Sequence, residues 1–117
     1  MTKTFKRNGF FMNKYTMASG HQAIVIYKPD LIRIITRHIP HATIYLFSGH
    51  SLGLSSQPSD VDLAIDAGHE IDQSVIDAIC ADIDALKLHF FIDVVDLNAV
   101  YEELRGQIQA HGVVWKV

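Results

Sequence analysis

The sequence predicts an α/β (α+β) fold, a small mixed β-sheet with helices packed on one face. Short apolar runs rich in β-branched and aromatic residues, which are typical of strands, recur along the chain. Segments with apolar residues every three or four positions, which are typical of helices, separate these runs. The chain has 117 residues, of which 49% are hydrophobic and 20% are charged, so it can bury one core but not two. We therefore expect one domain over 28–117, preceded by an N-terminal arm or short extra element over 1–27.

The first half of that domain is expected to hold one helix and two strands. The apolar segment 21–27 is either an extra edge strand or the lead-in to a helix. Pro29 suits the first turn of a helix, which helical spacing continues to a stop at Pro40. The segment 42–47 is β-branched and aromatic and predicts a buried strand. Two glycines, five serines and a proline in 48–59 predict a long loop, and loops of that length are usually functional.

The second half repeats the alternation of strands and helices. After an acidic strand near 60–66, apolar residues recur at helical spacing over 71–86, and Cys80 is interpreted as a small core residue of this helix. A strand is expected over 89–95 and a helix over 98–110, with Gly112 as its C-cap. The end of the chain, 113–117, is expected to form a short closing strand.

Composition excludes several classes of protein. A formal net charge of −3 leaves no broad basic surface for nucleic acid. No run approaches the roughly 18 to 20 apolar residues that cross a bilayer, so we expect no membrane partner and a cytoplasmic location. One cysteine cannot form an internal disulfide. The expected solvent-exposed charges and the histidines without metal-ligand spacing are Asp72, Asp77, Asp82, Asp84, His21, His38, His41, His69, His89 and His111.

The acidic strand near 60–66 holds the candidate metal-ligating residues. Val61, Leu63 and Ile65 would cover one face, so Asp60 and Asp62 must emerge together on the other. Neighbouring carboxylates raise each other's pKa unless a cation lies between them, and hard oxygen ligands suit Mg²⁺. Asp93 interrupts another apolar strand, and it could join the same metals if the two strands are neighbours. Asp96 is interpreted as a cap of the last helix.

These residues resemble the minimal nucleotidyltransferases of the polymerase-beta superfamily. The resemblance rests on the glycine-serine segment after Phe47, the Asp-x-Asp of Asp60 and Asp62, and the later strand with Asp93. It implies a polymerase-beta-like nucleotidyltransferase core with Asp60, Asp62 and Asp93 as catalytic residues and metal ligands. It also implies nucleotide contacts from Ser48, Gly49, His50, Ser51 and Gly53.

The resemblance further implies a Mg²⁺-dependent enzyme that uses two ions and moves AMP from ATP to a hydroxyl acceptor. In small bacterial members the acceptor is often a partner protein, a HEPN-type toxin, and the transferase is the antitoxin. Self-association is left open by the sequence.

Two other functions are compatible with the sequence. Ser48 and Gly49 stand in reversed order relative to the family, and His50 and Leu52 replace the usual arginines, which weakens phosphate binding. The protein could therefore be a weak or inactive nucleotidyltransferase-fold module that neutralises a partner by binding it. A remote alternative is a serine hydrolase, because Gly49, Ser51 and Gly53 also spell a nucleophile elbow, although Pro58 stands where that motif needs a helix.

Overall fold

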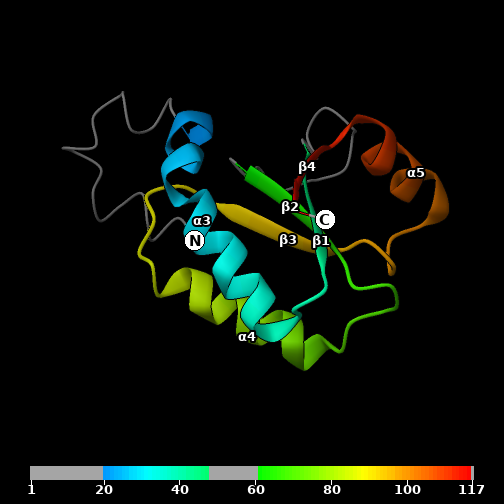
Figure 1. Ribbon diagram of the computed structural model, residues 1–117, viewed down its shortest axis with the longest axis horizontal. Helices are drawn as coiled ribbons and strands as arrows, with labels where there is room; N and C mark the ends of the chain where they lie inside the picture. Colours follow the sequence, from blue (N-terminus) through cyan, green and yellow to red (C-terminus); the bar gives the residue numbers. More distant parts are fainter. Residues whose placement is uncertain (1–19, 48–60, 117) are drawn as a thin grey trace.

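A four-stranded mixed sheet forms the centre of the molecule in a computed structural model that describes residues 20–47 and 61–116 (Figure 1). The strand order is β3-β2-β1-β4. β2 and β3 are parallel, whereas β1 pairs antiparallel with both β2 and β4. This arrangement confirms the predicted small α+β fold. The described elements are α3 (Gly20–His38), β1 (Thr43–Phe47), β2 (Val61–Asp66), α4 (Gln73–Asp84), β3 (Ile92–Asp96), α5 (Glu102–His111) and β4 (Val113–Lys116).

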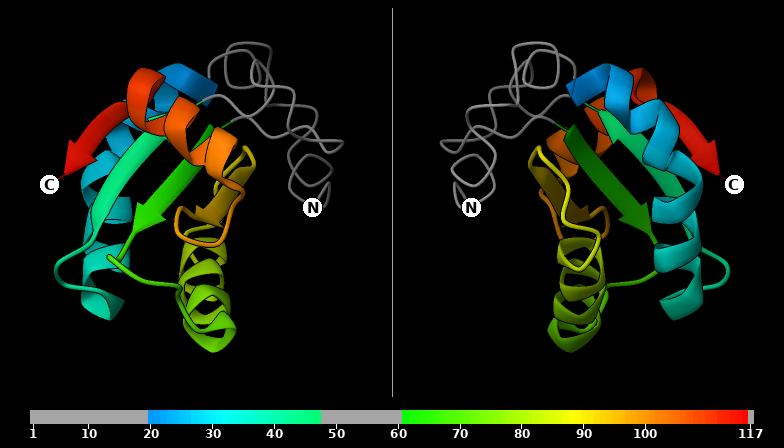
Figure 2. Two further views of the ribbon diagram at one scale, coloured as in Figure 1. Left: turned by 90° about the vertical axis from the view of Figure 1, so that its right-hand side faces the viewer. Right: turned by 90° about the vertical axis from the view of Figure 1, so that its left-hand side faces the viewer.

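Helices lie on both faces of the sheet, as the two views of Figure 2 show. α3 and α4 pack on the face that carries Leu63 and Ile65, and these side chains form the main core with residues such as Ile35 and Ile79. The expectation of helices on one face is right for these two helices and wrong for α5. α5 packs on the opposite face, where Leu104 and Ile108 cover Ala64. The small apolar Ala64, set between two acidic positions of β2, is what allows a helix to approach that face.

α3 begins earlier than the sequence indicates. The ambiguous segment 21–27 is helical, and Pro29 lies inside the helix instead of in its first turn. Proline cannot donate to the carbonyl of Val25, and Val25 is 70% exposed, so water can satisfy that carbonyl. The buried Ile24 and the contact between the rings of Tyr27 and Phe90, 6.2 Å apart, tie this part of α3 to the core. A domain division at residue 27 stays a prediction, and it would cut through α3.

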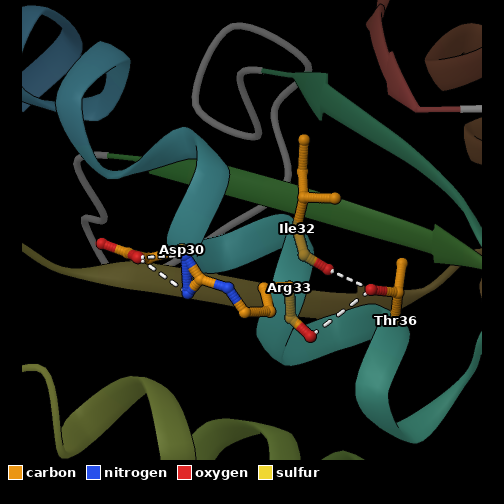
Figure 3. A network of polar contacts seen from close by, with 4 residues as sticks. All are labelled: Asp30, Ile32, Arg33 and Thr36. Carbon is orange, nitrogen blue, oxygen red and sulfur yellow. Dashed lines mark hydrogen bonds and ion pairs between the residues drawn. The ribbon is translucent and has the colours of Figure 1, made fainter.

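Local hydrogen bonds support the second half of α3 (Figure 3). Arg33 donates through both terminal nitrogens to Asp30 Oδ1, at 3.0 and 2.8 Å. The Thr36 hydroxyl donates to the Ile32 carbonyl at 2.8 Å. The Arg33–Asp30 pair is exposed and the Thr36 hydrogen bond is half-buried, so both contacts stabilise the helix modestly.

The later elements differ from expectation mainly at their ends. α4 is shorter at both ends than 71–86. α5 starts at Glu102 and not at residue 98, because residues 96–99 form a turn in which the amide of Ala99 donates to the Asp96 carbonyl. Gly112 is confirmed as the C-cap of α5, and the predicted closing strand is β4. Gly112 is needed there for space, since its φ is −73° and an added Cβ would lie 2.6 Å from the Ile108 carbonyl oxygen.

The single cysteine, Cys80, lies on a helix that packs against the main core. Cys80 is a free, half-buried thiol on α4. Burial raises the pKa of this thiol, and the negative charges of Asp84 and Asp77 raise it further. A raised thiol pKa leaves little thiolate at neutral pH, which agrees with the interpretation of Cys80 as a core residue. Within the described ranges, no helix combines the length and the apolar character that crossing a bilayer demands.

Candidate functional site

Parallel pairing of β2 and β3 brings two of the predicted acids together. Asp62 and Asp93 are register partners, directly side by side on the two strands. Apolar residues follow both acids along the strands. β2 is buried from Val61 to Ile65, whereas the residues of β3 that follow Asp93 are half-buried. The juxtaposition that the sequence analysis required of these two residues is therefore observed.

Strand alternation places both acids on the same face of the sheet. Ala64 and Val95 are the next residues on that face, and both belong to the core beneath α5. Val61 and Leu63, one position away from Asp62, belong to the core beneath α3 and α4 instead. Asp62 and Asp93 thus lie on the α5 face, at the end of β2 and β3 where these strands begin. We call this pair of residues the acidic end of the sheet.

Asp62 is a buried acid. Its side chain is 6% exposed, and it is the one charged residue among the described residues that is buried. Every buried side-chain nitrogen or oxygen in the described part of the chain has a hydrogen-bond partner. Burial restricts the orientations open to the Asp62 carboxylate, and a ligating carboxylate requires a restricted orientation.

Asp93 titrates abnormally because of its surroundings. Loss of solvent raises the pKa of Asp93, and the neighbouring Asp62 carboxylate raises it further, whereas a hydrogen bond from the Val94 amide lowers it. The first two effects penalise the charged form of Asp93. A cation between the two carboxylates would remove that penalty.

The chemistry of these donors fits Mg²⁺. Carboxylate oxygens are the hard ligands that this ion prefers, and Mg²⁺ keeps open positions for phosphate oxygens and water. Within residues 20–47 and 61–116, no group of three or more ligating side chains surrounds a common position. Asp62 and Asp93 are two of the three predicted ligands, and the third, Asp60, lies outside the described residues.

The predicted nucleotide contacts also lie outside the described residues. These are Ser48, Gly49, His50, Ser51 and Gly53. The chain leaves β1 at Phe47 and enters β2 at Val61, and both residues lie at the acidic end. Connectivity alone thus attaches the glycine-serine segment next to Asp62.

Phe47 is a site residue that the sequence analysis treated only as part of a strand. It is the register partner of Asp62 on β1, and its half-buried ring packs against the core beneath α5. The ring therefore lies beside the buried carboxylate on the same face. Its position directly before the glycine-serine segment was the signal that could have identified it.

A second pair of acids occupies the other end of the same two strands. Asp66 Oδ1 accepts hydrogen bonds from the Gly68 amide and the Asn98 side chain, both at 2.8 Å. Asp96 accepts from the amides of Ile71 and Asn98, at 2.7 and 3.0 Å. The prediction that Asp96 caps the last helix is therefore wrong. Asp96 accepts from amides of two loops, and the N-cap of α5 is Tyr101.

Comparison with known proteins identifies solved structures that are similar to this chain. No protein-family model matches the chain, and no curated protein matches it. Among solved structures, a mutant of the MntA-HpeT toxin-antitoxin is similar with a TM-score of 0.57 and 23% identity, over 75% of this chain and 70% of that chain. The fold is nucleotidyltransferase-like.

A second solved structure is described as the toxin-antitoxin with AMP-PNP. It is similar with a TM-score of 0.57 and 27% identity, over 75% of this chain and 71% of that chain. The similarity supports a fold of the minimal nucleotidyltransferase type.

Proposed function

We propose that this protein is a Mg²⁺-dependent nucleotidyltransferase that moves AMP from ATP to a hydroxyl group of a partner protein. In this proposal it is the antitoxin of a toxin-antitoxin pair, and the partner is a HEPN-type toxin. The observation that carries the proposal is the side-by-side placement of Asp62 and Asp93 on neighbouring parallel strands.

The placement of Asp93 beside Asp62 favours a metal role for Asp93 over a structural one. A carboxylate kept for stability normally has a lowered pKa, because hydrogen bonds or cations favour its charged form. The pKa of Asp93 is raised instead, first by desolvation and then by Asp62. Two such carboxylates side by side destabilise the metal-free protein. A divalent cation bound between them would offset this unfavourable free energy.

The reaction would be an in-line displacement at the α-phosphorus of ATP. The acceptor hydroxyl oxygen forms the new bond, the bond to pyrophosphate breaks, and the hydroxyl proton passes to a carboxylate. Bound Mg²⁺ would supply charge stabilisation for the phosphate oxygens. Asp62 and Asp93, with Asp60, would hold the ions, and Asp93, the more exposed of the two described acids, would take the proton.

A protein acceptor agrees with the extent of the described fold. The described fold consists of one sheet and its covering helices, with no additional domain in the described residues to bind an acceptor. The neighbours with this fold are described as toxin-antitoxin structures, one of them with AMP-PNP. A partner that supplies both the acceptor hydroxyl and the surface around it would complete the site.

The test is transfer of label from ATP that is radioactive at the α-phosphate to the protein encoded beside this one. We expect labelling that needs Mg²⁺ and falls about 10²- to 10³-fold in Asp62→Asn, which keeps the shape of the side chain but removes its charge. Asp84→Asn is the matched control, because Asp84 is an exposed acid on α4 and should leave labelling unchanged. Equal labelling by the wild type and Asp62→Asn would contradict the proposed site.

A second function is favoured by the reversed Ser48-Gly49 pair and by the missing arginines of the adjoining segment. Both changes reduce triphosphate binding, so the protein could neutralise its partner by binding alone. The same experiment separates the two functions. Tight partner binding by wild type and Asp62→Asn alike, without any labelling, would favour the binding module. Ser51, on which the hydrolase alternative depends, also lies outside the described residues.

A further inference from the structure

A cavity of about 330 Å³ lies at the opposite end of the sheet from Asp62 and Asp93. It is formed where the α3-to-β1 connection meets the connection from β2 to α4. Three histidines, His38, His41 and His69, and two exposed carboxylates, Glu70 and Asp72, line it. The proposed transferase reaction uses none of them.

Hydrogen bonds determine which ring nitrogen carries the proton in two of these imidazoles. His41 Nε2 lies 3.2 Å from the Ala67 carbonyl oxygen, and His69 Nδ1 lies 2.8 Å from the Glu70 carbonyl oxygen. A carbonyl oxygen only accepts, so in each case the ring nitrogen carries the proton and donates it. In the neutral rings, His41 Nδ1 and His69 Nε2 therefore retain free lone pairs.

This pattern is the one that histidine ligands of metals show. A metal-bound imidazole almost always donates its other N–H to a carbonyl or carboxylate, which fixes the tautomer and the ring orientation. His38 differs, because its Nε2 is paired with Asp82 Oδ2 at 2.8 Å and links α3 to α4. His41 and His69 thus have the hydrogen-bond pattern of metal ligands, whereas His38 forms a contact between α3 and α4.

The separation of the two rings is somewhat larger than one shared ion requires. The ring centroids of His41 and His69 are 6.5 Å apart with planes inclined at 46°. Metal–nitrogen bonds of about 2.1 Å place the centroids of two imidazoles on one tetrahedral ion roughly 5 Å apart. Both side chains are exposed, so the rings can move closer together without disturbing the core.

We propose that His41 and His69 form a binding site for a borderline divalent transition metal such as Zn²⁺, at the end of the sheet opposite the acidic end. Imidazole nitrogen favours Zn²⁺, Ni²⁺ and Cu²⁺ over Mg²⁺, so the two ends of the sheet select different ions. No ready group of three ligands exists among the described residues, so water and a rotated Glu70 or Asp72 complete the coordination. An ion there would link the α3-to-β1 connection to the loop that leads into α4.

The experiment is calorimetric titration of the full chain with Zn²⁺ in the presence of excess Mg²⁺, which keeps Zn²⁺ from the carboxylates of the acidic end. We expect one bound Zn²⁺ per chain, and at least about tenfold weaker binding in His41→Ala and in His69→Ala. His38→Ala is the matched control from the same cavity and should change the affinity less than twofold. Asp62→Asn should likewise leave Zn²⁺ binding unchanged.

Nitrogen-15 NMR of the wild-type imidazoles tests the site without any substitution. We expect Zn²⁺ to shift His41 Nδ1 and His69 Nε2 while the partner nitrogens keep their protons. Undiminished Zn²⁺ binding by a folded His41→Ala, His69→Ala double variant would overturn the proposal. An equal loss in His38→Ala, or resonances of both imidazoles that Zn²⁺ leaves unmoved, would do so as well.

Discussion

The strands β2 and β3 each carry an acid near each end, and the groups that surround these acids differ between the two ends. At one end the carboxylates of Asp66 and Asp96 accept hydrogen bonds from three backbone amides and from the Asn98 side chain. At the other end Asp62 and Asp93 are register partners, and Asp62 raises the pKa of Asp93. The first pair joins the loops that follow the two strands, whereas the second pair brings like charges together.

The difference separates the acids that hold loops in place from the acids that we propose as metal ligands. All four residues are aspartates next to apolar strand residues, so residue type and local pattern do not distinguish them. What distinguishes them is the set of groups around each carboxylate. Backbone amides and the Asn98 side chain donate hydrogen bonds to Asp66 and Asp96, whereas desolvation and the like charge of Asp62 raise the pKa of Asp93.

The largest expected effect on stability belongs to the structural pair. Asp96→Ala removes the acceptors of the Ile71 and Asn98 amides, and we expect the free energy of unfolding to fall by about 1–3 kcal/mol. Urea denaturation measures this change. Asp72→Ala is the control, because Asp72 is exposed at the N-cap position of α4 without a side-chain cap bond, and it should cost less than about 0.5 kcal/mol. Similar losses in both variants would remove the distinction between the ends.

A smaller effect of opposite sign is expected at the acidic end. Asp93→Asn removes the repulsion from Asp62, so the metal-free protein should gain about 0.2–1 kcal/mol at pH 7, a modest value because Asp93 is exposed to solvent. The folded-state pKa of Asp93 is raised, so wild-type stability falls as pH rises from the ordinary aspartate value through the raised one. The gain of Asp93→Asn should therefore vanish in acid. Urea denaturation of both proteins as a function of pH measures it, and a loss of stability at pH 7 would contradict the account.

Local pattern predicts much of this molecule, and long-range pairing decides the rest. The strand alternation that separates Asp62 from Val61 and Leu63 is visible in the sequence, as are the amphipathic spacing of α4 and the C-cap position of Gly112. The register of Asp62 with Asp93 is not visible, because parallel pairing depends on how α4 crosses between the strands. The helical segment before Pro29 was equally hidden, since its stability comes from the burial of Ile24 and the packing of Tyr27 on Phe90.

The same reason explains the missed histidines. His41 and His69 stand far apart in the sequence without ligand spacing, and only the antiparallel pairing of β1 with β2 brings the flanking connections together. A search for short metal motifs cannot find such a pair. Sequence analysis identified the acidic end because a recognisable motif and an alternating strand coincide there.

The central claim is that Asp62 and Asp93 hold a divalent cation jointly, and paramagnetic broadening by Mn²⁺ tests it most directly. We expect substoichiometric Mn²⁺, with an ATP analogue present, to broaden the carboxylate carbon signals of Asp62 and Asp93 together, and excess Mg²⁺ to restore both. The signals of Asp66 and Asp96 should be affected far less. Broadening of neither Asp62 nor Asp93, or of one without the other, would contradict the account.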